Sequence, residues 1–259
     1  MTRVSLVPHA TSAAAEDGVS RVHRLAAAGV SLGLLEVARA LVVERVVDDE
    51  ARSRWVEGVL ASRDAWTEDF DGEQYSLGRA FYTHLETGRS REYFADAAAS
   101  DARVERGAPG LQALLRAQLA ALTGARVVPR RGWCGAGVHV FPPREKVAQV
   151  GGVVHFDVEG LGRHHLSRRR RALSLVLMLQ CPEVGGGLRI WDVVYDGREH
   201  PTDDELAADG ELVVYRPGDL LVFDSYRLHQ IQPFGGARPR ISATLHAAEV
   251  DRGLWECWF

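Results

Sequence analysis

The feature that most constrains the fold is a series of short apolar segments that begins after Gly124. They lie at 136–141, 150–158, 171–180, 187–196, 210–218, 219–234 and 240–250, and turns rich in Gly, Pro and Asp separate them. About seven or eight strands at this spacing are typical of a sandwich, a barrel or a jelly roll. The pattern predicts a β-rich core and tail over 125–259.

The preceding part, 19–124, has a mainly helical pattern. Acidic residues open the segment 48–66, and its apolar residues recur at helical spacing. The segment 109–124 starts with a proline expected in the first turn and stops at a glycine, which is a complete helix signature. A helix is also expected at 76–86, whereas the β-branched residues of 38–47 also allow a strand.

The helical part is too apolar on one face to stand alone. We therefore expect it to pack on the outside of the β-rich part, which makes residues 1–259 a single α+β domain. Residues 1–18 are small and polar, and we expect them to form a loose arm.

Charge and cysteine content exclude several classes of protein. The net charge of −4 gives no basic field for nucleic acid or an anionic membrane. No run of about 18 apolar residues exists, and the first residues lack the apolar stretch of a signal peptide. The three cysteines are far apart and form no C-x-x-C pair, which favours free thiols in a reducing compartment. A cytoplasmic protein is expected.

A histidine and an aspartate stand two residues apart in the apolar segment 150–158. Strand alternation would place His155 and Asp157 on one face. A jelly roll could bring His229, from the later segment 219–234, to the same mouth. Two imidazoles and one carboxylate with open positions suit non-haem Fe(II), whereas the His-x-Asp pair alone is more typical of a core histidine and a strand-end aspartate.

An arginine and a serine follow the second histidine. In the segment 240–250, Arg240 and Ser242 would share one strand face. The guanidinium gives a two-pronged bond to a carboxylate, and the hydroxyl adds a further bond. An arginine alone usually forms a surface ion pair, but here it occurs in order with the candidate metal ligands.

His155-x-Asp157, His229 and Arg240-x-Ser242 together resemble the signature of the 2-oxoglutarate/Fe(II)-dependent dioxygenases. The segment "CPEVGGGLRIWD" also resembles the prolyl-hydroxylase-like branch of that superfamily. The resemblance covers about 134–250. It implies a double-stranded β-helix (jelly-roll) core, Fe(II) held by the two histidines and the aspartate, 2-oxoglutarate held by Arg240 and Ser242, and O2 as co-substrate.

The resemblance leaves two points to settle. Arg240 lies slightly farther past His229 than is usual for the family, and Arg238 is the alternative clamp; we favour Arg240, because only it has a serine two residues on. In addition, "GRAFYTHLE" and the Trp-rich tail resemble members that hydroxylate or halogenate free amino acids. The halogenating members replace the carboxylate by a small residue, so Asp157 disfavours halogenation.

Candidate substrate residues come from three further segments. Arg163 and His164 lie in a basic stretch, which is either a solvated loop or a flap that meets an anionic group. Arg79 either points to the pocket mouth or lies on the polar side of an amphipathic helix. Trp255 belongs to an apolar tail that docks on the core, forms a homodimer contact or covers the site.

The resemblance implies an enzyme that hydroxylates an unactivated C–H of a small polar molecule and releases succinate and CO2. A free amino acid or a specialised-metabolite intermediate is our first choice of substrate. Oxidative cyclisation, desaturation or epimerisation would use the same residues. A jelly roll that holds a metal and binds a ligand without turnover is the alternative from a different class.

Overall fold

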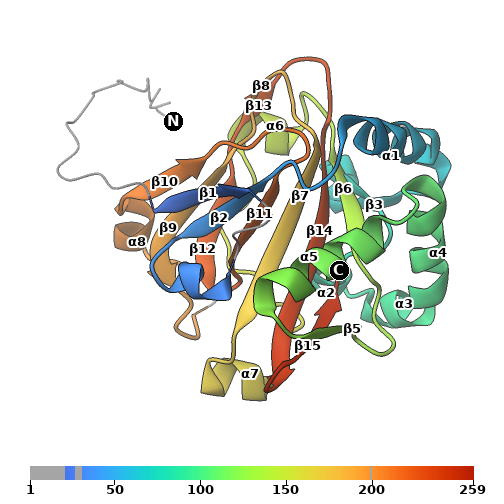
Figure 1. Cartoon of the computed structure of the whole chain (residues 1–259). Coiled ribbons are helices and arrows are strands. Elements are labelled where there is room, and N and C mark those ends of the chain that lie inside the picture. Colours follow the sequence, from blue (N-terminus) through green and yellow to red (C-terminus); the bar gives the residue numbers. More distant parts are fainter. Residues whose placement is uncertain (1–20, 27–30, 199) are drawn as a thin grey trace, which may run out of the picture.

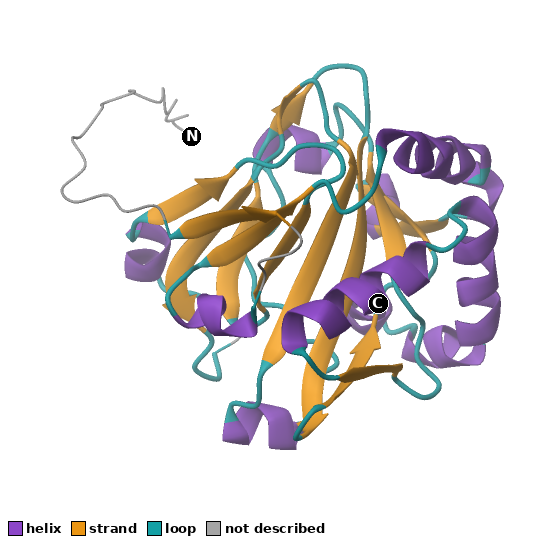
Figure 2. Cartoon of the chain, in the orientation of Figure 1, coloured by secondary structure: helices purple, strands orange, loops and turns teal. Residues whose placement is uncertain are grey.

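A computed structural model of the chain describes residues 21–26, 31–198 and 200–259. The arm expected at 1–18 lies outside these described residues. Within them, the chain combines a ten-stranded sheet, a three-stranded sheet and a two-stranded ribbon with eight α-helices (Figures 1 and 2). This confirms the mixed α+β class. No helix of the described part is long and apolar enough to cross a membrane.

The large sheet takes its strands from the whole length of the chain. Its spatial order is β1 (Val22–Ala26), β2 (Ala40–Glu44), β11 (Leu220–Asp224), β7 (Ala172–Gln180), β14 (Arg240–Asp251), β6 (Gly137–Phe141), β4 (Gln74–Leu77) and β3 (Thr67–Asp69). A further strand, β15 (Leu254–Trp258), pairs with β14 and with β5 (Arg126–Pro129). The long strand β14 is central, because it pairs antiparallel with β7 on one side and β6 on the other.

The three-stranded sheet has the order β10 (Gly210–Val213), β9 (Leu188–Val194) and β12 (Arg227–Ile231). A small ribbon pairs β13 (Phe234–Gly235) with β8 (Val184–Gly185). Ile190 of the small sheet is buried in one cluster with Val42 and Phe223 of the large sheet. The two sheets therefore pack face to face, with apolar side chains between them.

Helices cover the opposite face of the large sheet. Figure 1 shows α5 lying across the sheet, with α1 and α4 beside it. Leu115 and Leu119 of α5 are fully buried in a cluster with Val138, Leu175 and Ile241 of the strands. Complete burial of one such side chain stabilises the fold by about 1.5–3 kcal/mol. The expectation that helices pack on the outside of the β-rich part is confirmed.

The helices are short, apart from α1, α4 and α5. Their bounds are α1 Asp49–Ala61, α2 Phe81–Glu86, α3 Ser90–Ala95, α4 Ala97–Gly107, α5 Leu111–Thr123, α6 Lys146–Val150, α7 Arg163–Arg168 and α8 Asp203–Ala207. Within the described ranges, 3-10 turns lie at Leu32–Glu36, Arg63–Ala65 and Phe70–Gly72.

Several predicted elements agree with the structure. The helix expected at 48–66 is present as α1, and β2 confirms the strand alternative for 38–47. The helix expected at 109–124 ends at Gly124, whose φ of 62° is left-handed. Its proline was misplaced, since Gly110 is the N-cap and Pro109 precedes it.

Three expectations were wrong in part. The part 19–124 also supplies β1 to β4, because strands that short are stabilised by partners distant in sequence rather than by their own pattern. The helix expected at 76–86 begins only at Phe81. The strand expected at 150–158 is instead an irregular segment that follows α6, and a single bridge joins it to β12.

Candidate metal centre and its cavity

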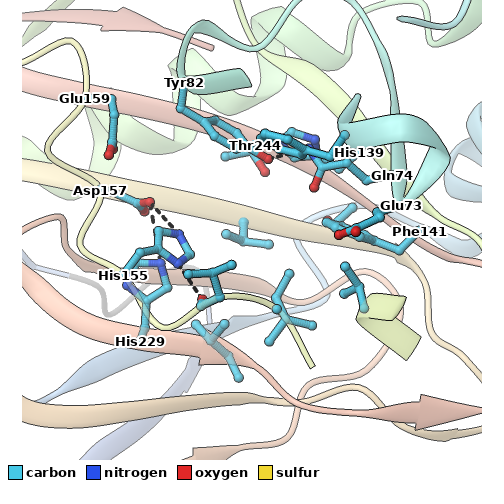
Figure 3. Close-up of a pocket in the computed structure, with 18 of the residues that line it drawn as sticks. Glu73, Gln74, Tyr82, His139, Phe141, His155, Asp157, Glu159, His229 and Thr244 are labelled. Atoms are coloured by element: carbon cyan, nitrogen blue, oxygen red, sulfur yellow. Dashed lines mark hydrogen bonds and ion pairs between the residues drawn. The ribbon is translucent and has the colours of Figure 1, made fainter. Parts of the chain in front are cut away.

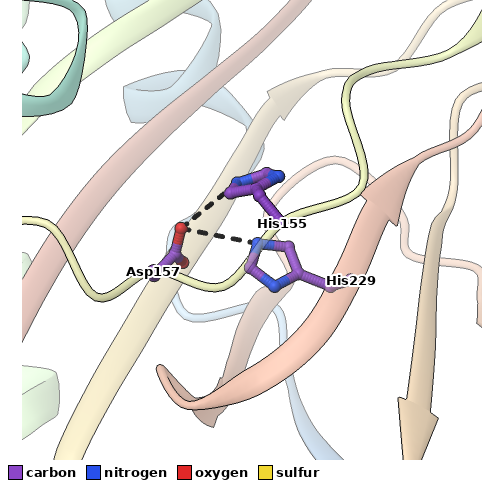
Figure 4. Close-up of side chains that lie close together, drawn as sticks. All are labelled: His155, Asp157 and His229. Atoms are coloured by element: carbon purple, nitrogen blue, oxygen red, sulfur yellow. Dashed lines mark ion pairs between the residues drawn. The ribbon is translucent and has the colours of Figure 1, made fainter. Parts of the chain in front are cut away.

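The irregular segment after α6 lies against the edge of the small sheet. Its one antiparallel bridge joins His155 to His229, with backbone N···O distances of 3.1 and 3.0 Å in the two directions. Asp157 then donates its backbone N–H to the carbonyl of Ser225 at 2.9 Å. These bonds hold the segment extended, so the side chains of His155 and Asp157 point the same way although no regular strand forms (Figure 4).

The three predicted metal ligands converge on one point. Nε2 of His155 lies 3.3 Å and Nε2 of His229 lies 3.5 Å from Oδ1 of Asp157. One ligand atom from each residue lies within 4.8 Å of the other two. Figure 4 shows the two rings side by side, with the carboxylate of Asp157 facing both of them. The structure thus brings together residues that are 74 positions apart at most.

The surrounding bonds orient these ligands. Nδ1 of His155 lies 2.8 Å from the carbonyl oxygen of Val153, and Nδ1 of His229 lies 2.9 Å from that of Arg227. A carbonyl only accepts, so each ring donates from Nδ1 when neutral and turns the Nε2 lone pair toward the shared point. Ser174 Oγ donates to Oδ2 of Asp157 at 2.6 Å, which leaves Oδ1 facing the rings. This donor set fits a divalent transition metal.

The electrostatics of the three residues favour a positive charge at their centre. Burial works to raise the pKa of Asp157, but the charges of His229 and His246 and a bond from His155 hold it well below its usual value. Burial lowers the pKa of His155, yet Asp157 outweighs burial and raises it to about 9. A metal cation at the shared point would replace those protons.

A buried arginine faces the same cavity and has no carboxylate partner in the part of the chain that the structure describes. Arg240 is 1% exposed; its Nη1 donates to Ser242 Oγ at 3.0 Å and its Nη2 to the hydroxyl of Tyr215 at 2.7 Å. Its buried Nε has no partner within the described residues. An uncompensated buried cation is costly, so an anion is expected to occupy this end of the cavity.

Arg238 is placed differently from Arg240. Its side chain is 59% exposed and lies 3.7 Å from Glu183 at the surface. Arg238 and Arg240 are two residues apart, so strand alternation alone would place both side chains on the same face. The difference arises because β14 begins at Arg240, which makes that side chain the first to point inward between the sheets.

A cavity of about 460 Å³ joins the metal ligands to Arg240 and Ser242. Its walls are partly aromatic, with Phe223 and Trp258 among them. Figure 3 shows a polar group opposite the metal ligands, formed by Gln74, Tyr82, His139 and Thr244. No role was predicted for Gln74 or Tyr215, because only pairing between distant segments brings Gln74 to the cavity and Tyr215 to Arg240.

The four candidate substrate residues lie outside the cavity lining. Arg79 bonds to Asp96 at 2.6 Å, and Trp255 is buried in the core between the large sheet and the helices. Along β15 the side chains alternate, so Trp258 rather than Trp255 reaches the cavity. Arg163 and His164 are exposed on α7.

Comparisons with known proteins bear on the fold. No protein-family model and no curated protein matches the sequence. Solved structures do match. An N-substituted L-amino acid dioxygenase from Burkholderia ambifaria has a TM-score of 0.55 and 17% identity, over 86% of this chain and 87% of that one.

Two further structures extend the likeness. The α-ketoglutarate-dependent epimerase SnoN of nogalamycin biosynthesis has a TM-score of 0.51 and 14% identity, with 82% and 79% of the chains covered. A prolyl hydroxylase from Trichoplax adhaerens has a TM-score of 0.50 and 13% identity, with 82% and 84% covered. SnoN is also known in complex with Fe3+ and α-ketoglutarate. The chain therefore has a fold similar to that of these dioxygenase, epimerase and hydroxylase structures, and this is the fold that the motif resemblance predicted.

Proposed function

We propose that this protein is an Fe(II)- and 2-oxoglutarate-dependent oxygenase that hydroxylates a small polar molecule. One observation carries the proposal: three oriented candidate metal ligands share one cavity with a buried arginine that has no counter-ion among the described residues. A site that merely held a metal would have no need of a buried cation beside it. The similar structures of 2-oxoglutarate-dependent enzymes support the same chemistry.

His155, Asp157 and His229 would hold the iron, and Arg240, Ser242 and Tyr215 would bind the distal carboxylate of 2-oxoglutarate. The iron, with 2-oxoglutarate and O2, would supply the oxidant for an unactivated C–H, and succinate and CO2 would be released. The chain's own part is to fix the ligand atoms through the carbonyls of Val153 and Arg227, and to present the substrate's C–H from the aromatic walls.

We further infer a double-stranded β-helix core within a single domain. Two facing sheets with apolar contacts between them support the first inference. The second is supported by a core cluster that includes residues of both 19–124 and 125–259. Epimerisation stays a second candidate, because SnoN is among the similar structures.

The experiment is an assay of succinate release with Fe(II) and 2-oxoglutarate, in which amino acids and small metabolites are offered as substrates. We expect slow release without substrate and faster release with an accepted one. Retention of 2-oxoglutarate with no succinate under any condition would favour the ligand-binding alternative.

A further inference from the structure

The charges around the cavity do not balance, and the excess is negative. Five carboxylate side chains line it, whereas Arg240 and Lys146 are its only lysine or arginine side chains within the described residues. Two of the carboxylates are accounted for: Asp157 as a metal ligand and Glu73, which pairs with Lys146 at 2.8 Å. Glu159, Glu86 and Asp71 remain.

The bound cofactors would not neutralise this excess. In the proposed function, on which this inference rests, the charges of a divalent metal, Asp157, a dicarboxylate and Arg240 cancel. Glu159, Glu86 and Asp71 form no ion pair with another side chain in the part of the chain that the structure describes. Their charge is therefore left for the substrate to compensate.

Glu159 is the best placed of the three. It is half-buried and follows the metal ligand Asp157 by two residues, and Figure 3 shows both carboxylates on one side of the cavity. Glu86, at the end of α2, is exposed at the rim. A half-buried carboxylate without a cation is costly, which is the situation that a cationic ligand relieves.

A separate observation shows that the cavity is built for a polar ligand. His139 is only 6% exposed and lines the cavity, yet its Nδ1 has no hydrogen-bond partner within the described residues. Burial lowers the pKa of His139 to about 3, so the imidazole is neutral. Beside it, Tyr82 accepts a bond from Gln74 at 2.6 Å, which leaves its hydroxyl proton to donate.

We propose that the substrate is an amine that binds as its ammonium cation, with Glu159 as the main partner and Glu86 adding attraction at the rim. His139 and Tyr82 hydrogen-bond a neutral polar group of the same molecule, and the aromatic walls contact its apolar body. Among the described residues that line the cavity, no cation is free for an acidic group of the substrate, because Lys146 pairs with Glu73 and Arg240 engages the 2-oxoglutarate carboxylate.

The test uses protein loaded with Mn(II) and 2-oxoglutarate and three probes of one shape: 2-phenylethylamine, 2-phenylethanol and 3-phenylpropanoate. Mn(II) broadens the proton signals of a probe that binds near it, so binding is measured without turnover. We expect the amine to bind at least about tenfold more tightly than the alcohol, and the acid to bind weakest.

Variants then identify the partner. Glu159→Gln should remove most of the amine's advantage, and Glu159→Lys should transfer the preference to 3-phenylpropanoate. Glu86→Gln should cause a smaller loss. Glu57→Gln, which makes the same charge change on the exposed surface of α1, is the matched control and should change nothing.

Three results would overturn the inference. The alcohol could bind as tightly as the amine, the proton signals of the amine could show no broadening, or the Glu159→Gln protein could keep the preference for the amine over the alcohol. If the Glu159 variants do not fold, the order of the three probes on the unaltered protein decides. Binding of Mn(II) and 2-oxoglutarate without an amine preference would reject only this inference. Failure to bind either one would reject the proposed function and this inference with it.

Discussion

The two faces of β14 have opposite chemistry. Arg240, Ser242 and other alternate residues point between the sheets toward the cavity. Ile241, Ala243 and Leu245 point outward and are fully buried against the helices. A single strand therefore supplies both a binding surface and a core. Polar groups are tolerated on its inner face because neighbouring hydroxyls bond to them and the cavity lies beside them, whereas its outer face tolerates only close packing.

This contrast predicts that substitutions on the inner side affect binding, whereas those on the outer side affect stability. The largest effect is expected at the metal ligands. Asp157→Ala should abolish succinate release, because it removes one of the three candidate metal ligands. Replacing a residue that only holds a metal ligand in place weakens metal binding about ten- to hundredfold, and we expect a larger loss here. Asp196→Ala, which removes a surface carboxylate paired with Arg198, is the control. Near-normal 2-oxoglutarate consumption by the Asp157 variant would disprove the metal assignment.

The outer face can be tested with neighbouring residues of β14. Leu245→Ala should lower the free energy of unfolding by about 2–5 kcal/mol, because it leaves a cavity in the packed core. Thr244→Ala, one residue away on the inner face, should cost less than about 1 kcal/mol. Chemical denaturation measures both. A Leu245 variant that keeps full stability but loses 2-oxoglutarate binding would reverse the comparison.

Two arginines test the inner face. Arg240→Ala should raise the KM for 2-oxoglutarate about ten- to a hundredfold, as expected when a charge-assisted bond worth about 1.5–3 kcal/mol is lost. Arg238→Ala should leave that KM unchanged, because its side chain is exposed beside Glu183. A larger effect at Arg238 would transfer the clamp to that residue.

The smallest effect is expected at Arg79, which lies outside the cavity lining. Arg79→Ala breaks a partly buried pair with Asp96, so we expect a stability loss of about 1 kcal/mol or less. Thermal unfolding and the 2-oxoglutarate KM are the measurements. Loss of product formation with unchanged stability would instead support the direct substrate role first considered for this residue.

The sequence predicted the convergence of His155, Asp157 and His229 better than it predicted the local structure around them. Residue type and order in the sequence indicated His155, Asp157 and His229 as candidate metal ligands. Neither signal depends on a regular strand around these residues. The strand expected at 150–158 did not form, because Gly151 has a φ of 86° and only one bridge joins the segment to β12. Strand alternation therefore predicted correctly that the side chains of His155 and Asp157 point the same way, although no regular strand holds them there.

The positions of other side chains around the cavity could not be predicted from the local sequence pattern. Strand β4 is only four residues long, and its pairing with β6 places Gln74 near the cavity. Tyr215 reaches Arg240 across 25 residues, which no local pattern indicates. Strand alternation alone places Trp255 and Trp258 on opposite faces, because they are three residues apart. Which of the two faces the cavity depends on how β15 pairs with β14.

The central claim is that one cavity holds both a divalent metal and a dicarboxylate. Calorimetric titration of 2-oxoglutarate into the protein, with and without Mn(II), tests it most directly. The account predicts one binding site per chain, strong dependence on the metal, and loss of most affinity in Arg240→Ala. Equal affinity with and without metal, or unchanged affinity in that variant, would contradict it.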